Sequence, residues 1–303
     1  MHTQPKITVI IPTSCTTKRA KLLLRAISSI HKAGPSIVKI IIAANGSHID
    51  PDLALGLQAR QDLHYIWFEE GSLPKTISLA IALIDTEYFG FLDDDDELLP
   101  RSLIHRLVTL QQTPTADLVI SNGYLRKSGE DSLYLNFINQ VPDDPLGSFF
   151  RENWLPSCGA LFRTSSIGPE YFRDYHPYAE WSWLAFRLAM NGKRICVLNE
   201  PTFRIHADTP SSLSKSAEYR QCYVSLYRKM LDMNPPLRIR RILQRRLSQA
   251  HHDVSDWLLS EGRVGAAALH FLFSLRSRSG WRFLPYSRYI VSAAFRKIIS
   301  QKS

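Results

Sequence analysis

The spacing of apolar residues in the first 120 positions alternates between strand and helix patterns. Short apolar runs predict buried strands at Ile7–Ile11, Ile37–Ala44, Tyr65–Phe68, Tyr88–Leu92 and Asp117–Ser121. Between these runs, apolar residues at helical spacing predict helices at Arg19–Ala33, Thr76–Ile84 and Leu98–Gln112. Strands that alternate with helices favour right-handed βαβ units. The pattern therefore predicts a Rossmann-like α/β fold, with a mostly parallel sheet flanked by helices.

The pattern becomes less regular after residue 122. Gly123–Asp174 is rich in turn residues, and such a stretch in an α/β protein often forms loops over the ligand crevice. Further strands are still expected at Ala160–Arg163, Arg194–Leu198 and Thr202–His206, and one helix is expected at Pro177–Met190. We expect Pro12 to stop the first strand, because proline lacks the N–H that a central strand donates.

The last part of the chain differs in both pattern and charge. It predicts helices at Tyr219–Met233, Leu237–Leu259, Val264–Leu275 and Tyr289–Ile299. Residues 1–214 carry 20 Lys/Arg and 23 Asp/Glu, whereas residues 215–303 carry 17 and 5, a net charge of +12. The change falls near the Ser/Thr/Pro-rich segment Asp208–Ser216. The sequence therefore predicts two domains, residues 1–215 and a basic helical region at 216–303.

Length and composition narrow the class of protein. A chain of 303 residues with 45% hydrophobic content can bury a substantial core. The first residues lack a signal-peptide pattern, and the longest uncharged apolar stretch, Val264–Leu275, is too short to span a bilayer. The four cysteines are widely spaced, which favours reduced thiols over a zinc site or a disulfide framework. These features predict a cytoplasmic protein.

The chemistry is expected at the acidic run Asp93–Glu97, which follows the apolar strand Tyr88–Leu92 directly. Adjacent carboxylates repel one another, so they need a counter-ion or a wet loop. Carboxylate oxygens suit Mg²⁺ or Mn²⁺, and ligands bind at the carboxyl ends of strands in open α/β sheets. The alternative is a solvated acidic loop that leads into the next helix.

Five motifs in order resemble those of family 2 glycosyltransferases, inverting enzymes of the GT-A type that often make bacterial cell-surface polysaccharides. They are the strand with Pro-Thr at Ile7–Thr13, the strand and turn Ile40–Ser47, the acidic motif Glu87–Glu97, the helix Glu180–Ala189 and the Arg-x-His segment Arg204–Ser214. The resemblance covers about residues 5–215. It implies a GT-A fold and the transfer of a sugar from a nucleotide diphosphate.

The resemblance also implies roles for individual residues. Asp95 and His206 would bind Mn²⁺ or Mg²⁺, with Asp93 on the donor or in the metal shell, and the metal would neutralise the departing diphosphate. The remaining residues expected to bind the donor are Pro12, Thr13, Asn45, Lys75, Asp94 and Arg204. The family's Arg-Asn in the helix before the acidic motif is absent, and Lys75, one turn earlier, would supply the positive charge in its place. Asn45 stands where the family usually has an acid, so the identity of the nucleotide base is open.

Inversion requires a base that accepts the proton of the acceptor hydroxyl. The resemblance implies Glu180 for this role. The family usually has Asp at the next position, where this chain has Trp181. Glu180 then acts as the base itself, or Trp181 marks a different acceptor geometry. The residues expected to contact the acceptor are Trp154, Ser157, Gly159 and Trp181.

The leading hypothesis is a metal-dependent inverting glycosyltransferase that acts on a hydroxyl of a polysaccharide or lipid-linked glycan. A catalytically impaired GT-A protein that binds nucleotide or membrane is the alternative, and nucleotidyl transfer fits less well because the Gly-rich N-terminal loop of those enzymes is absent. Basic amphipathic helices with aromatic residues suit an anionic membrane surface, which predicts peripheral binding at the inner face of the cytoplasmic membrane. A solvated basic cap explains the same residues, and no motif supports nucleic-acid binding.

Overall fold

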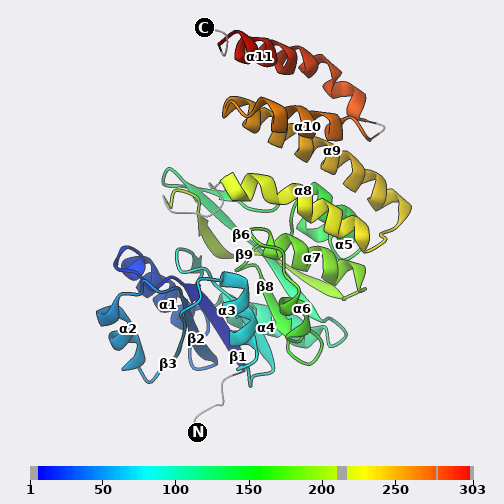
Figure 1. The fold of residues 1–303 in the computed structure, drawn as a ribbon. Coiled ribbons are helices and arrows are strands. Elements are labelled where there is room, and N and C mark those ends of the chain that lie inside the picture. Colours follow the sequence, from blue (N-terminus) through cyan, green and yellow to red (C-terminus); the bar gives the residue numbers. More distant parts are fainter. Residues whose placement is uncertain (1–5, 210–216, 278, 301–303) are drawn as a thin grey trace. The chain divides into compact units, whose positions relative to one another are not determined.

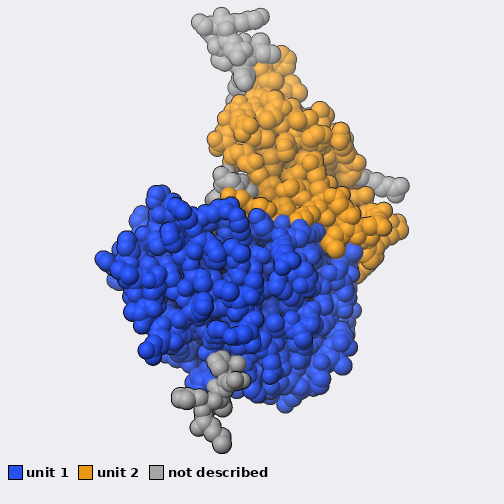
Figure 2. Space-filling model, turned by 60° about the horizontal axis from the view of Figure 1, so that its bottom comes forward, with its two compact units in different colours: residues 1–175, 180–211 blue, residues 176–179, 212–303 orange. Residues whose placement is uncertain are grey.

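A computed structural model describes residues 6–209, 217–277 and 279–300 (Figure 1). The described residues divide into two compact units, residues up to 175 with 180–211 and residues 176–179 with 212–303 (Figure 2). The predicted boundary at residue 215 falls in a stretch, 210–216, that lies outside the described residues.

A mixed sheet forms the centre of the first unit. Its strands lie in the order β3-β2-β1-β4-β8-β6-β9-β5, and β7 pairs with β6. Their bounds are β1 Ile7–Thr13, β2 Val38–Asn45, β3 Leu63–Phe68, β4 Tyr88–Phe91, β5 Glu97–Leu98, β6 Leu118–Lys127, β7 Glu130–Leu133, β8 Ala160–Arg163 and β9 Ile195–His206. The block β3-β2-β1-β4 is parallel throughout, as is the pair β6–β9, which confirms the predicted α/β class.

Helices pack on this sheet (Figure 1). They are α1 Ala20–Ala33, α2 Pro51–Gln58, α3 Leu73–Ile81, α4 Ser102–Gln112, α5 Pro145–Arg151, α6 Glu170–Arg173 and α7 Glu180–Met190. The predicted apolar face of α1 is buried, with Leu23, Ile27 and Ile30 at 1% exposure or less. Gly34 caps its C-terminus, as the sequence indicates.

Three expectations about element boundaries are wrong. β1 continues through Pro12 to Thr13, which lies level with Ala44 of β2. The fourth helix begins at Ser102 rather than Leu98, because Glu97 and Leu98 pair with β9 as the short strand β5. The strands expected at 194–198 and 202–206 are one strand, β9, whose register on β6 shifts within Ser121–Tyr124.

The irregular stretch Gly123–Asp174 holds more regular structure than its pattern indicates. It contains the end of β6, the strands β7 and β8 and the short helices α5 and α6. β6 and β7 form a hairpin whose turn, Ser128-Gly129, has positive φ at both residues. β8 lies at the strand expected over Ala160–Arg163. The elements β7, α5 and α6 were not predicted, because each is too short for a hydrophobic period to be detected.

The second unit is helical. It consists of α8 Ala217–Asp232, α9 Leu237–Ser260, α10 Val264–Ser274, the 3₁₀ segment Gly280–Tyr286 and α11 Ser287–Ser300. Its core contains Val254 and Leu258 of α9, Ala267 and Phe271 of α10 and Phe283 of the 3₁₀ segment. Among the described residues, no helix combines the length and apolar character that crossing a membrane requires.

A histidine pair makes this unit sensitive to acid. His251 is 3% exposed, its Nδ1 lies 3.2 Å from Nδ1 of His270, and its Nε2 lies 3.2 Å from an Arg228 nitrogen. Burial, then His270 and Arg228, lowers the pKa of His251 to about 4. The unfolded chain takes up this proton near pH 6.5, whereas the folded chain does not, so stability is present above pH 6.5 and falls toward pH 4.

We expect this acid sensitivity to cost the second unit about 3 kcal/mol at most at pH 4, from a shift of roughly 2.5 pKa units. The measurement is hydrogen exchange by mass spectrometry on α9 and α10 peptides at pH 7 and pH 5, corrected for intrinsic rates. His251→Gln is expected to flatten the dependence. Equal pH slopes in both proteins would contradict the role of His251.

Candidate active site

The carboxyl ends of β1, β2 and β4 bring three predicted site residues together. Thr13 ends β1, and its hydroxyl donates to Asp94 Oδ2 at 2.6 Å. Asn45 ends β2, and its amide nitrogen donates to the Thr13 carbonyl oxygen at 3.1 Å. Parallel strands end at one edge of the sheet, so residues that are 81 positions apart in the chain meet there.

The acidic run faces two ways. Asp94 and Asp96 are 3% and 4% exposed, whereas Asp93 and Asp95 are partly exposed. The pKa of Asp93 is raised to about 7, mainly because the surrounding protein removes water from its carboxylate, although the side chain keeps some exposure. The negative charges of Asp95 and Asp94 also raise this pKa, whereas a hydrogen bond from Ser157 Oγ at 2.7 Å lowers it. Burial also raises the pKa of Asp96 well above its usual range. Asp94 and Asp96 are therefore buried side chains, and the alternative of a solvated acidic loop does not describe them.

Each inward acid is anchored to a different part of the sheet. Asp94 binds Thr13 and the guanidinium of Arg19, whose Nε donates at 3.1 Å. Asp96 accepts the backbone N–H of His206, at the end of β9, at 3.0 Å. These contacts hold the turn in place from both sides and leave Asp93 and Asp95 at the partly exposed side.

Two arginines that the motifs did not single out lie on the acidic run. Arg19 also approaches Asp95, with a terminal nitrogen 3.4 Å from Oδ1. Arg25, on α1, donates to the Asp95 carbonyl oxygen and lies 3.3 Å from Glu97 Oε1. Their place in the sequence carries a usable signal, because the helix after the first strand of such a sheet begins at the same edge.

The closing motif forms an ion-pair network at the end of β9. His206 Nε2 lies 2.8 Å from Glu97 Oε1, so the predicted metal ligand is engaged by an acid of the run. Arg204 forms hydrogen bonds with Asp131 of β7 and lies 4.0 Å from Glu97 Oε2. The structure thus places both residues beside the acidic run, with each side chain already bonded.

The residues expected to contact the acceptor separate in the structure. Ser157 holds Asp93, and a Cβ on Gly159 would lie 2.6 Å from the Pro156 ring, so only glycine fits there. Trp154 is 1% exposed and donates its indole N–H to the Pro145 carbonyl oxygen. Its ring is therefore part of the core, which gives no support to the prediction that it contacts the acceptor.

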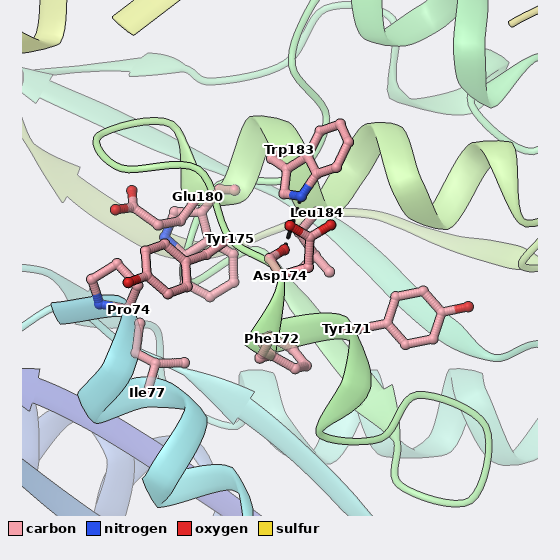
Figure 3. Close-up of a pocket in the computed structure, with 10 residues that line it drawn as sticks. Pro74, Ile77, Tyr171, Phe172, Asp174, Tyr175, Glu180, Trp183 and Leu184 are labelled. Carbon is pink, nitrogen blue, oxygen red and sulfur yellow. Dashed lines mark hydrogen bonds between the residues drawn. The ribbon is translucent and has the colours of Figure 1, made fainter. Parts of the chain in front are cut away.

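Glu180 is the first residue of α7 and lines a small pocket (Figure 3). Apolar and aromatic side chains from α3 and from the α6–α7 region form much of its wall, including Pro74, Ile77, Phe172, Tyr175 and Leu184. The Trp181 ring makes an edge contact with Phe91, with centroids 4.9 Å apart. The first turn of α7 therefore packs against the strand that ends in the acidic run.

Among the described residues, Lys75 forms its ion pair outside the acidic run. It pairs with Glu70 and lines a hollow of about 280 Å³ with Trp67, Phe68 and Leu79. Phe68 lies level with Asn45 across β2 and β3. The hollow is thus next to the end of β2, where the sequence predicts the nucleotide.

The carboxylates of the acidic run are the candidate ligands for the predicted metal ion. Among the described residues, no three His, Cys, Asp or Glu side chains are grouped so as to hold a metal ion. Mg²⁺ and Mn²⁺ commonly bind through one or two carboxylates together with substrate phosphates. Asp93 and Asp95 fit such a shared site, since both are partly exposed carboxylates on one turn. His206 fits less well, because Glu97 holds its Nε2.

A buried arginine supports the segment that holds Asp93. Arg106 is 1% exposed and donates to the Cys158 carbonyl oxygen at 2.7 Å, to Thr202 Oγ1 at 2.6 Å and to Ser121 Oγ at 3.0 Å. Burial lowers its pKa to about 10, so it stays charged at neutral pH. No carboxylate among the described residues lies within salt-bridge distance of it. The guanidinium thus fixes the residue next to Ser157 by hydrogen bonds alone.

Arg106→Met is expected to lower the free energy of unfolding by about 2–4 kcal/mol, through an unpaired Cys158 carbonyl and a cavity. Urea unfolding measures this change. Arg194→Met, at an exposed position, is the matched control and is expected to change stability by about 0.5 kcal/mol or less. Equal stability of the two variants would contradict the role given to Arg106.

Comparison with known proteins connects this geometry to a family. The sequence profile described as "Glycosyl transferase family 2" matches residues 8–166. No curated protein matches the chain. Solved structures with a similar fold include S. aureus TarS 1-349 in complex with UDP-GlcNAc, with TM-score 0.63, 14% identity, and coverage of 89% of this chain and 81% of that one.

A second similar structure is the mannosyltransferase PcManGT from Pyrobaculum calidifontis in complex with GDP-Man and Mn²⁺. Its TM-score is 0.55 and its identity 16%, over 98% of this chain and 88% of that one. At these identities the likeness concerns the fold. Both structures are complexes with a nucleotide sugar.

Proposed function

Because this chain belongs to glycosyl transferase family 2 and is a nucleotide-sugar glycosyltransferase of GT-A fold, we propose that it is metal-dependent and inverting. The sugar moves from a nucleoside diphosphate to a hydroxyl of a polysaccharide or lipid-linked glycan. The observation that carries the proposal is the acidic turn after β4, which is anchored through Asp94 and Asp96 and presents Asp93 and Asp95 at its partly exposed side.

The donor lies along the carboxyl edge of β1, β2 and β4 in this proposal. Pro12, Thr13 and Asn45 line the nucleoside side, and Lys75 stands at the neighbouring hollow. Arg19 bridges Asp94 and Asp95, and its guanidinium is suited to diphosphate oxygens. Arg204 adds a second positive charge next to Glu97.

Asp95, with Asp93, would hold a Mn²⁺ or Mg²⁺ ion, which would offset the negative charge that builds on the departing diphosphate. Asp93 is kept in place by Ser157. The Arg106 hydrogen bond to Cys158 keeps Ser157 in register. In this proposal the chain supplies two carboxylates on a turn that these hydrogen bonds anchor.

Glu180 is the base of the proposed reaction. The acceptor oxygen attacks the anomeric carbon and its proton passes to the Glu180 carboxylate. The bond from the anomeric carbon to the diphosphate oxygen breaks, and its electron pair leaves with the nucleoside diphosphate. The pocket beside Glu180 has largely apolar walls, which limits competition from water at the acceptor side.

The basic C-terminal region bears on where the enzyme meets its acceptor. The net charge of +12 over residues 215–303 supports an anionic membrane surface as a further partner. Peripheral binding at the inner face of the cytoplasmic membrane would deliver the enzyme to a lipid-linked acceptor.

The alternative is a catalytically impaired protein of the same fold that binds nucleotide or membrane. It is motivated by Trp181, whose ring packs against Phe91 where the family usually has an acid. In that protein nucleotide binding persists without turnover, and Glu180→Gln changes nothing measurable.

The experiment is a thermal-shift screen of UDP-, GDP-, CDP- and TDP-sugars with and without Mn²⁺, followed by turnover of the best binder. A ligand that binds the folded state raises the melting temperature by mass action. We expect one base to give a metal-dependent shift and the corresponding sugar nucleotide to be consumed. Binding without consumption on any glycan acceptor would favour the impaired protein. No shift with any nucleotide would reject the transferase and leave only the membrane-binding form of the alternative.

A further inference from the structure

Large apolar side chains are exposed along the last three elements of the second unit. They are Leu269 and Leu272 of α10, Trp281 and Leu284 of the 3₁₀ segment, and Val291 and Phe295 of α11. Trp281 is 71% exposed and Phe295 is 63% exposed. Single exposed apolar residues need no explanation, but a set confined to consecutive elements usually marks a contact surface. We call these six residues the apolar surface.

The helices that carry the apolar surface bury their opposite faces in the core of the second unit. In α10, Ala267 and Phe271 enter the core, whereas Leu269 and Leu272 face out. In α11, Ile290 is buried, and Val291 and Phe295, four residues apart, share an exposed face with Arg288. The exposure therefore follows helical periodicity and is a property of the fold.

The position of α11 makes this surface unusual. Within the second unit α8 packs on α9, α9 on α10 and α10 on α11, so α11 ends the stack (Figure 1). A terminal helix of such a stack normally needs a polar outer face for solubility. Here that face carries aromatic and aliphatic side chains.

Charge identifies the partner. Residues 262–303 contain eight Lys/Arg and no Asp or Glu. The guanidinium carbons of Arg276, Arg282 and Arg288 lie 4.6, 4.6 and 4.7 Å from the ring centroids of Phe273, Phe283 and Tyr289. All three arginines are exposed. Basic head groups next to exposed apolar side chains are the arrangement of helices that lie in a membrane interface.

We propose that the apolar surface inserts into the headgroup region of an anionic bilayer, with Trp281 and Leu284 entering the acyl boundary. The net charge supports contact with the surface of such a membrane. The exposed apolar side chains are the reason to infer that the protein also inserts into it. The inference rests on the membrane part of the proposed function and is independent of sugar transfer. A second copy of the chain is disfavoured as occupant, since two equally basic surfaces repel. Nucleic acid would use the arginines and leave the leucines in water.

The test is flotation of the full-length protein with vesicles of phosphatidylcholine alone, or with about 30% phosphatidylglycerol. We expect binding only to the anionic vesicles. Trp281→Ser/Leu284→Ser is expected to weaken partitioning about tenfold or more, because two large apolar side chains are lost. Leu24→Ser/Leu55→Ser, at exposed positions of the first unit, is the matched control and is expected to bind like the wild type.

Insertion has its own readout. Lipids brominated on the acyl chain are expected to quench tryptophan fluorescence in the wild type. Trp281→Phe, which keeps an aromatic side chain, is expected to bind while losing most of the quenching. Donor turnover without vesicles is measured in parallel, and the Trp281→Ser/Leu284→Ser protein is expected to match the wild type, so failure of either proposal stays distinguishable.

Four results would overturn the inference. The first is equal binding of wild type and Trp281→Ser/Leu284→Ser, which reduces the contact to charge. The second is binding without quenching. The third is a dimer in sedimentation velocity, lost in the double variant, which assigns the surface to a second copy. The fourth is displacement of vesicles by an equal charge of duplex DNA, which assigns it to nucleic acid.

Discussion

Asp95→Asn is expected to reduce sugar transfer about 10³-fold, while the protein folds normally. The substitution keeps the shape of the side chain and removes its charge, so the diphosphate loses the metal that would offset its charge. Asp95 is partly exposed, and Arg19 can turn fully to Asp94, which limits the cost to stability. The measurement is initial rate with saturating donor and Mn²⁺, together with the Mn²⁺-dependent thermal shift.

Asp85→Asn is the matched control for this result. Asp85 is an exposed acid of the same unit that pairs with Lys39 at 2.8 Å. It is expected to keep its rate and its metal-dependent shift. Wild-type turnover by Asp95→Asn, or an unchanged Mn²⁺ shift, would show that this acid holds no metal and would undo the proposed mechanism.

Glu180→Gln is expected to lower kcat by about 10²–10⁴ and to leave donor binding unchanged. Glutamine fills the same space at the start of α7 but cannot take the proton of the acceptor hydroxyl. The two readouts are turnover on the acceptor and the thermal shift with donor and Mn²⁺. Loss of the first with retention of the second separates the base from the donor-binding residues.

Asp174→Asn tests whether this effect belongs to Glu180 or to any acid of the pocket. Asp174 lines the same pocket, with its carboxylate 3.8 Å from Arg187 Nε. It is expected to retain most activity. A large loss in Asp174→Asn together with a small one in Glu180→Gln would transfer the base to Asp174.

The parallel half of the fold was predictable because each of its main elements has a clear hydrophobic pattern in the sequence. β1, β2 and β4 are short apolar runs, and α1 buries the face that its spacing indicates. α2 was not predicted, although Asp50 caps it and Pro51 opens it, because its eight residues are too few for a helical period. β9 was divided in two because Glu200 and Pro201 interrupt the apolar pattern, whereas tertiary pairing with β6 carries the strand through them.

The site was predictable where it follows from the edge of the sheet. Thr13, Asn45 and Asp94 meet because strands that are parallel end together. Arg19 and Arg25 were missed because their spacing is not distinctive. Their place after the first strand indicates the edge of the sheet where they lie, and the fold identifies the acid, 70 or more residues away, that each of them contacts. Trp154, in contrast, was assigned a role in the site that its burial does not support. Its burial depends on packing that the sequence does not display.

The anchoring of the acidic turn has a consequence for the smallest piece of chain that can work. One end is tied through Asp94 to Thr13, the last residue of β1, and the other end is tied through Asp96 to the His206 N–H at the end of β9. The stretch 8–166 that matches the family profile ends before that last strand. A fragment cut there would contain every acid of the run, but it would lack both the His206 N–H that holds Asp96 and the proposed base Glu180. Recognition of the family is therefore local in sequence, whereas the alignment of its carboxylates requires a chain extending at least to residue 206.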